Sequence, residues 1–182
     1  ATGCYTVVVI TVNSLPASIT GTAAVCPGLT TTLNDATGSG VWSSSDNSLA
    51  TVGSSSGVVT GVAAGSVTIS YTVGTGCYNT ITVTVNSLPS SISGTASVCQ
   101  GLTTTLSDAG GGTWSSSDNS IATIGSSSGV MSGVTVGNAT ITYTLSTGCY
   151  NTVAATVNAL PSAISGTASV CVGSITTLSD AG

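Results

Sequence analysis

The chain has 182 residues and a net charge of −5, and it contains no Lys, Arg, His or Glu. Without cationic side chains it cannot neutralise phosphates, which excludes nucleic acid binding and a basic patch for anionic membranes. No apolar run reaches the roughly 20 residues of a spanning helix, so we expect no membrane insertion of this segment. Hydrophobic residues make up 41% of the chain, which favours a folded protein over a disordered one.

The chain is a tandem repeat with a period of 72 to 73 residues. Gly-Cys-Tyr begins at Gly3, Gly76 and Gly148, and Trp-Ser-Ser-Ser-Asp-Asn-Ser begins at Trp42 and Trp114. The spacing predicts the last strand of a preceding repeat (1–13), two whole repeats (14–86 and 87–158) and the first strands of a following repeat (159–182).

Neither end piece holds enough strands to close a core. We therefore expect the chain to be part of a longer protein. Strand donation to another partner is the alternative interpretation.

Apolar and hydroxyl residues alternate within each repeat, which is typical of strands with one buried face. Val67 and Ile69, for example, alternate with Thr68 and Ser70. Turn residues such as Pro27-Gly28 separate the alternating segments, and no stretch has a helical period. The strands predicted for the first repeat are 18–25, 29–35, 41–45, 49–52, 58–62, 66–73 and 77–86.

About seven short strands per repeat, with one Trp on the third, are the pattern of an immunoglobulin-like sandwich. The predicted fold is therefore all-β, with tandem immunoglobulin-like β-sandwiches and no helix. Trp42 and Trp114 are the predicted core aromatics. A Trp that stacks on carbohydrate is the alternative for each.

Several ordered motifs carry a family resemblance. They are Val41-Trp42-Ser43-Ser44-Ser45-Asp46-Asn47, Leu49-Ala50-Thr51-Val52 and the run from Gly57 to Ile69, with Ile121-Ala122-Thr123-Ile124 and the run from Gly129 to Val134 in the second repeat. This combination resembles the bacterial immunoglobulin-like domains of the second group. The resemblance implies a secreted or surface-anchored bacterial protein, because many such domains form the stalks of adhesins such as intimin and invasin.

Catalysis is not expected, because a Ser or Cys nucleophile has no His to activate it and the only carboxylates are Asp. We predict no enzyme activity and no cofactor. Asp46-Asn47-Ser48 is typical of a turn in which the side chain binds its own backbone. The alternative is a Ca²⁺ site in which Asp46 and Asn47 meet Asp108 of the next repeat. The glycosylation pattern Asn138-Ala139-Thr140 has no counterpart in the first repeat and is interpreted as incidental.

Six Cys at matched positions in an exported chain predict disulfides rather than free or metal-bound thiols. Bonds within a repeat, Cys26 with Cys77 or Cys99 with Cys149, are disfavoured. The first and last strands run parallel in such folds, which places the two Cys of a repeat at opposite poles. We therefore predict a bond between repeats, Cys26 with Cys149. The remaining cysteines of the chain, Cys4, Cys77, Cys99 and Cys171, are expected to pair outside this chain segment.

The leading functional hypothesis is a structural extracellular fibre or stalk at the cell surface. Its expected partners are neighbouring repeats of the same chain, with other copies of the fibre as a second class. Each repeat is expected to add on the order of 35 to 40 Å. The alternative is adhesion, in which the repeats bind a surface, a glycan or a neighbouring fibre through Tyr5, Tyr78 and Tyr150.

Overall fold

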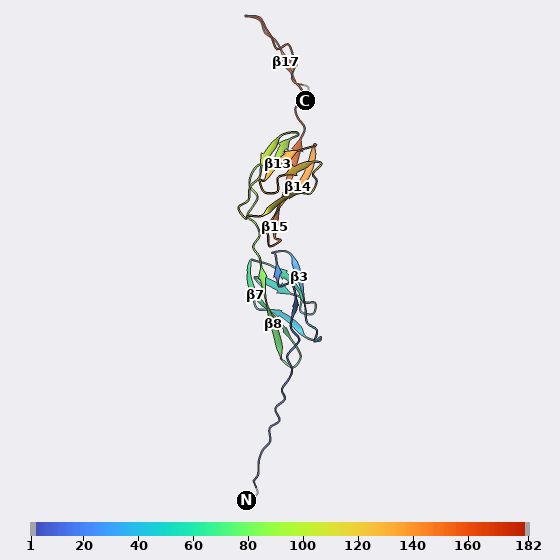
Figure 1. The fold of residues 1–182 in the computed structure, drawn as a ribbon, viewed down its shortest axis with the longest axis vertical. Coiled ribbons are helices and arrows are strands. Elements are labelled where there is room, and N and C mark those ends of the chain that lie inside the picture. The colour runs from blue at the N-terminus through green and yellow to red at the C-terminus, as the bar shows by residue number, and fades with distance from the viewer. Residues whose placement is uncertain (1–2, 181–182) are drawn as a thin grey trace. The chain divides into compact units, whose positions relative to one another are not determined.

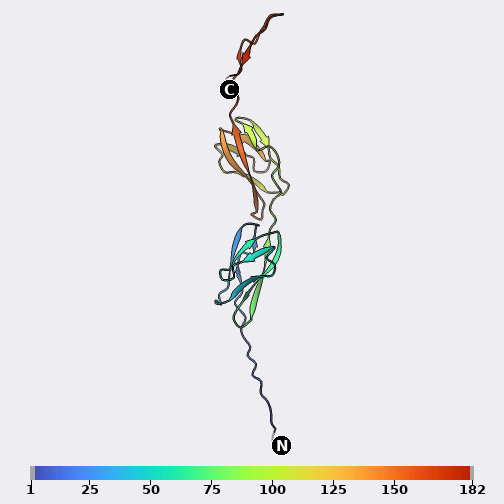
Figure 2. The same cartoon turned by 180° about the vertical axis from the view of Figure 1, so that it is seen from behind.

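The computed structural model describes residues 3–180, which form strands and no helix. None of these residues therefore lies in a helix long and apolar enough to cross a membrane. The chain divides into two compact units, Ala1–Leu88 and Pro89–Gly182, each of which is a sandwich of strands (Figures 1 and 2).

The first unit follows the predicted order of elements closely. Most boundaries lie within one or two residues of those expected from the apolar alternation. Its strands are β1 (Thr20–Gly21), β2 (Ala24–Val25), β3 (Thr30–Asn34), β4 (Val41–Ser44), β5 (Ala50–Val52), β6 (Val58–Gly61), β7 (Gly65–Thr72) and β8 (Tyr78–Val85).

These strands form two four-stranded sheets, with the orders β1-β3-β6-β5 and β2-β8-β7-β4. All pairs are antiparallel except β2 with β8, in which Val25 lies opposite Val85. This arrangement of two sheets is that of a constant-type immunoglobulin sandwich. The fold prediction is confirmed.

The first strand of the repeat, here called strand A, is divided rather than continuous over 18–25. Its first part, β1, pairs with β3, and its second part, β2, joins the other sheet beside β8. Gly21 makes the change of sheet possible. It has a φ of 122°, and a Cβ there would collide with the carbonyl oxygen of Thr32.

The core of the first unit is built from the inward residues of both sheets. Val67, Ile69 and Tyr71 of β7 and Val83 of β8 are all buried, as their alternation with hydroxyl residues predicts. Trp42 packs against Tyr71 with ring centroids 4.7 Å apart and planes tilted by 50°. The Tyr71 hydroxyl accepts a hydrogen bond of 2.8 Å from the backbone N–H of Gly40.

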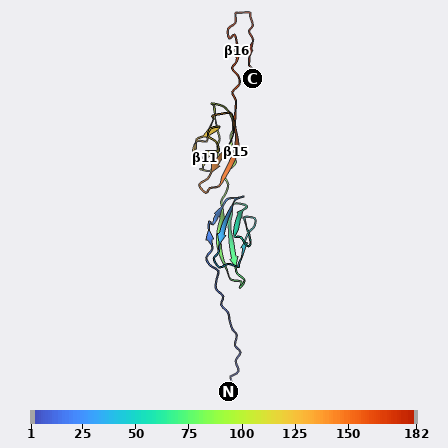
Figure 3. The same cartoon turned by 90° about the vertical axis from the view of Figure 1, so that its right-hand side faces the viewer.

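The second unit is also built from two sheets, one of three strands and one of four (Figures 1 and 3). The Trp114–Tyr143 pair has ring centroids 4.6 Å apart. The strands of the second unit are β9 (Ser97–Cys99), β10 (Thr103–Thr105), β11 (Thr113–Ser116), β12 (Ala122–Ile124), β13 (Val130–Gly133), β14 (Gly137–Thr144) and β15 (Tyr150–Asn158). They form sheets with the orders β10-β13-β12 and β11-β14-β15-β9.

The two end pieces differ from each other. Residues 3–13, assigned by the sequence to the last strand of a preceding repeat, form no strand here and are exposed. An extended segment becomes a strand only when a neighbour completes its hydrogen-bond ladder, and no described segment does so. Near the other end, β16 (Ser165–Gly166) pairs with β17 (Leu178–Ser179), as β1 pairs with β3.

Replacing Tyr71 with Phe tests the hydrogen bond that ties the aromatic core to the loop before β4. The change leaves the part-buried Gly40 N–H without its acceptor, so we expect the free energy of unfolding of the first repeat to fall by about 1–2 kcal/mol. Chemical denaturation followed by tryptophan fluorescence measures the change. Tyr143→Phe is the matched variant in the second repeat, because Tyr143 accepts from Gly112 at 2.6 Å.

The control is Tyr78→Phe, which removes an exposed hydroxyl and should alter stability by no more than about 0.5 kcal/mol. An equal loss in Tyr71→Phe and Tyr78→Phe would contradict the proposed importance of the Gly40 bond.

Candidate functional site

The two cysteines of each repeat lie at opposite ends of its sandwich. Cys26 directly follows β2, and Val25 of β2 lies opposite Val85, near the end of the last strand of the repeat, here called strand G. Cys77 directly precedes that strand, so the two cysteines are nine strand positions apart. At about 3.3 Å per residue the separation is about 30 Å, whereas the Cα atoms of a disulfide lie within about 7 Å. A bond between Cys26 and Cys77 is therefore impossible in this fold.

The second repeat has the same geometry. Cys99 lies opposite Asn158 in the parallel pair of β9 and β15, and Cys149 precedes β15. Nine strand positions again separate the two cysteines, which excludes a bond between them. Each repeat therefore presents one Cys at each end.

The oxidation states of the cysteines differ. Cys26 and Cys149 are disulfide-bonded, and both are buried, at 7% and 0% exposure. The remaining four cysteines have free thiols. Two of these are half-buried, Cys77 and Cys99, and two are exposed, Cys4 and Cys171.

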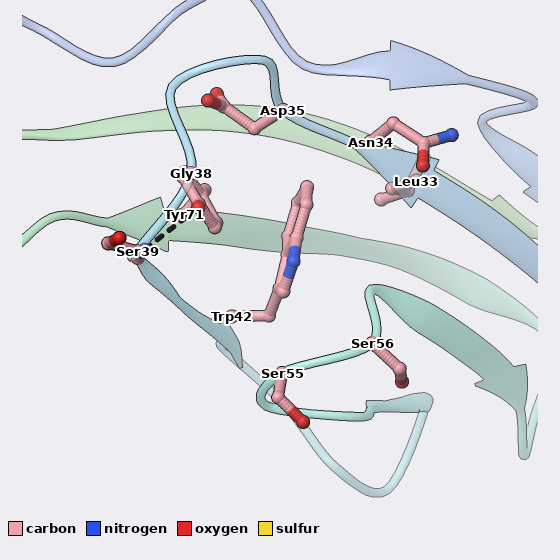
Figure 4. A pocket seen from close by; sticks show the side chains of 10 residues that line it. Leu33, Asn34, Asp35, Gly38, Ser39, Trp42, Ser55, Ser56 and Tyr71 are labelled. Carbon is pink, nitrogen blue, oxygen red and sulfur yellow. Dashed lines mark hydrogen bonds between the residues drawn. The ribbon is translucent and has the colours of Figure 1, made fainter.

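A cavity of about 410 Å³ lies beside the core aromatics of the first repeat. Figure 4 shows Trp42 standing among Tyr71, Leu33 and the serines of the loop before β6. Trp42 is 6% exposed and Trp114 is 7% exposed, and both belong to the hydrophobic cores. Neither indole presents an open face on which a sugar ring would stack.

Asp46 and Asp118 close the same turn in the two repeats. In the first, Ser48 donates to Asp46 Oδ1 from its hydroxyl at 2.6 Å and from its backbone N–H at 2.8 Å. The same two bonds join Ser120 to Asp118. These bonds favour the ionised form and lower the pKa of both carboxyl groups below the ordinary value of 3.8, with the Ser hydroxyl as the largest cause. The turn predicted from the sequence is present.

Asp35 and Asp108 occupy matching positions after the second strand of each repeat. Asp35 Oδ1 accepts from the backbone N–H of Thr37 at 2.8 Å, and in Figure 4 its carboxylate points away from Trp42. Asp108 Oδ1 accepts from Gly110 at 3.1 Å. The second oxygen, Oδ2, is buried in both residues and has no hydrogen-bond partner among the described residues.

A Ca²⁺ site needs more oxygen ligands than any one of these Asp residues supplies. Within residues 3–180, no group of three or more His, Cys, Asp or Glu is arranged to hold a metal ion. The predicted site formed by Asp46, Asn47 and Asp108 involves two repeats and stays a prediction.

The outer face of β7 and β8 is a neutral surface of hydroxyl groups. Inward residues of these strands are apolar, so the outward positions carry the Ser and Thr of the alternation. The outward residues pair across the two strands as Ser66 with Thr84, Thr68 with Thr82 and Ser70 with Thr80. This face offers hydrogen bonds and methyl groups but no charge.

The tyrosines that follow the Gly-Cys motif are exposed, at 87% for Tyr5, 59% for Tyr78 and 45% for Tyr150. Each follows a cysteine directly. The only exposed aromatic residues among those described therefore occupy the same position, next to the cysteine that precedes the strand G segment. Asn79 and Asn151, one position further on, donate to the backbone oxygens of Ala17 and Ser90 at 3.1 Å and anchor the chain that enters each repeat.

The turns of Asp46 and Asp118 should make the protein sensitive to acid. A pKa that is lower in the folded state gives a stabilisation that is present above the ordinary value of 3.8 and is lost as the pH falls through the lower folded value. We expect the urea midpoint of unfolding to fall with pH in that window. The double variant Asp46→Ala, Asp118→Ala should show a smaller fall.

Ser48→Ala with Ser120→Ala is the matched control for the pKa itself, because it removes the hydroxyl donor and keeps the carboxylate. Its acid sensitivity should lie between those of the parent and the Asp variants. A pH dependence unchanged by the Asp substitutions would rule out these turns as its source.

Similarities to solved structures are distant. The chain is 21% identical to domains 4 and 5 of the S-layer protein SbsC, with 81% of this chain and 100% of that chain covered and a TM-score of 0.37. Against the C-terminal 282-residue fragment of intimin, in complex with the intimin-binding domain of its translocated receptor, the identity is 17%, the coverage 81% and 67%, and the TM-score 0.46. Against mouse cadherin-23 EC22-24 the identity is 13%, the coverage 80% and 64%, and the TM-score 0.34.

The chain spans 24% of the longer SbsC structure that contains domains 1–6. A comparison with curated protein sequences gives no match.

The family of bacterial Ig-like domains, group 2, matches the chain twice, over residues 27–85 and 78–167. The two matches together span most of the sequence and include both Trp residues and the strands around them. The resemblance predicted from the motifs of the third to sixth strands is confirmed, and the chain belongs to the bacterial Ig-like domain family, group 2.

Proposed function

We propose that this chain is part of an extracellular fibre or stalk at the bacterial cell surface, in which the repeats act as non-catalytic spacers. The two repeats have the same local interactions at equivalent positions, which supports this proposal. Tyr71 and Tyr143 accept the same loop hydrogen bond, and Asp46 and Asp118 close the same turn. A spacer needs only equivalent copies, whereas a specific binding site normally distinguishes one domain from its neighbours.

The junction between repeats is held by a disulfide between Cys26 and Cys149 in this proposal. The observation that carries it is the difference in oxidation state: Cys26 and Cys149 are disulfide-bonded, while the thiols of Cys77 and Cys99 are free. The nine-position separation excludes the two pairings within a repeat, Cys26 with Cys77 and Cys99 with Cys149, and so supports a bond between repeats. Such a bond joins the strand A end of one repeat to the strand G start of the next.

The same rule assigns partners to the other cysteines. Cys99 is the strand A cysteine of its repeat and would pair with the strand G cysteine of the repeat that follows it. Cys77 would pair with the strand A cysteine of the repeat before it. Cys4 and Cys171 would likewise pair with cysteines of further repeats. The fibre would then have one disulfide at every junction between repeats.

Adhesion is the second candidate, and the exposed tyrosines favour it. Tyr78 and Tyr150 are large amphipathic side chains of the kind enriched at protein interfaces. Their recurrence beside every strand G cysteine favours a contact at the junction over a site for a foreign surface. Lateral association of the neutral hydroxyl faces is a further route to partners, because no like charges oppose it.

Peptide mapping without reduction tests the junction bond. Cleavage before Asp yields the peptides 1–34, 46–107 and 118–179, which together carry all six cysteines. We expect one linked pair, 1–34 with 118–179. Links of 46–107 to both other peptides would show bonds within repeats and would overturn the junction.

Electron microscopy of the purified native protein separates the spacer from self-assembly. A spacer stalk should appear as isolated thin threads. Ordered thick filaments, formed without any added partner, would favour lateral assembly through the hydroxyl faces and would count against an isolated stalk.

A further inference from the structure

The cysteines divide the chain into segments of two kinds. Twenty-two positions separate each strand G cysteine from the next strand A cysteine, in 4–26, 77–99 and 149–171 alike. The distance from a strand A cysteine to the strand G cysteine of the same repeat is 51 positions in the first repeat and 50 in the second. The segments of constant length, here called linking segments, each run from the cysteine before the strand G position to the cysteine after strand A, although in 4–26 the strand G part forms no strand.

The strands of a linking segment have little length in reserve. In 77–99 the segment begins with β8 and ends with β9, and in 149–171 it begins with the nine residues of β15. A strand advances about 3.3 Å per residue, while a fully stretched chain reaches at most about 3.6 Å. Pulling a strand along its own axis therefore lengthens it by roughly a tenth at most.

The proposed bond between Cys26 and Cys149 encloses everything between these two residues in a covalent loop. Strands β3 to β8 and β9 to β14 lie inside this loop, together with Trp42 and Trp114. A force applied to the two ends of the chain enters and leaves the loop at the same disulfide. The enclosed part therefore bears no end-to-end tension.

We propose that tension along the fibre passes through the disulfides and the linking segments, and bypasses the remainder of every repeat. This inference rests on the proposed junction bond. Force travels along residues 3–26, crosses from Cys26 to Cys149, and continues along strand β15 toward Cys171. With Cys77 and Cys99 paired to further repeats, the segment 77–99 belongs to a second path beside the first. The sheets of the repeats keep the strands of each linking segment extended. The fibre therefore resists lengthening while the repeats stay folded.

Single-molecule stretching of the 182-residue chain, held by tags at its two ends, tests the inference. Oxidised and reduced chains should differ in stretched length by about 440 Å, which is the 123 positions between Cys26 and Cys149 at about 3.6 Å each. The reduced chain should show two unfolding steps, one for each repeat. The oxidised chain should show neither step, and its stretching and relaxation curves should coincide because strand A and β15, which bear the load, stay paired in their sheets.

Two cysteine variants provide matched controls. Cys26→Ser removes the bond and should behave like the reduced parent without any reductant. Cys77→Ser removes a free thiol of the same repeat and should behave like the oxidised parent. If Cys26→Ser proves unstable, the comparison of the parent with and without reductant remains.

Two different failures can be told apart. Unfolding steps in the oxidised parent, with no 1–34 to 118–179 link on mapping, would overturn the junction bond itself. Hysteresis in the oxidised parent, with that link mapped, would show that β15 or strand A is peeled from its sheet under load. That result would overturn the bypass of tension and leave the junction bond and the spacer function standing.

Discussion

The parallel pairing of strand A with strand G is the constraint on which the chemistry of this chain depends. Val25 lies opposite Val85 and Cys99 lies opposite Asn158, so the end of strand A and the end of strand G share one pole of the sandwich. A cysteine after strand A and a cysteine before strand G are then held a full strand length apart. Antiparallel pairing would bring them together and permit an ordinary bridge within the domain. The observed pairing separates them by nine positions and excludes that bridge.

The absence of cationic side chains leaves packing and backbone hydrogen bonds as the sources of stability. No polar or charged residue is buried among those described, and the two cores consist of aliphatic residues around one Trp and one Tyr each. The carboxylates serve local turns, as Asp46 does with Ser48, because no Lys or Arg is present to pair with them. The outward faces are left to Ser and Thr, which keep the sheets hydrated without charge.

Strand positions could be predicted well because burial imposes a two-residue period on β7 and β8. The division of strand A was missed, because the change of sheet at Gly21 depends on its close approach to β3, which the alternation of residues 18–25 does not reveal. Residues 3–13 show that an apolar pattern alone does not make a segment a strand. Val8, Ile10 and Val12 occupy the positions of the inward residues Ile81, Val83 and Val85 of β8, but without a ladder partner the segment stays exposed.

The predicted site depended on topology more than on motifs. Two matched Cys per repeat suggest a bridge within the repeat, and only the assumption of parallel outer strands argued against it. The register of strands A and G shows that nine strand positions separate the two cysteines in each repeat. The orphaned oxygens of Asp35 and Asp108 had no signal in the sequence, because burial of a single carboxylate oxygen depends on how the following loop folds over it.

The proposed load path would also account for where the repeats differ in length. The second repeat is one residue shorter, and that residue is lost between Asp108 and Trp114, in the loop before β11, which would lie inside the proposed covalent loop from Cys26 to Cys149. A loop there only has to connect two strands, and changing its length by one residue costs little. A residue lost from a linking segment would instead shorten one load path relative to the one beside it. Parallel paths share a force only when their lengths match, and the equal 22-position spans of the linking segments would meet that condition.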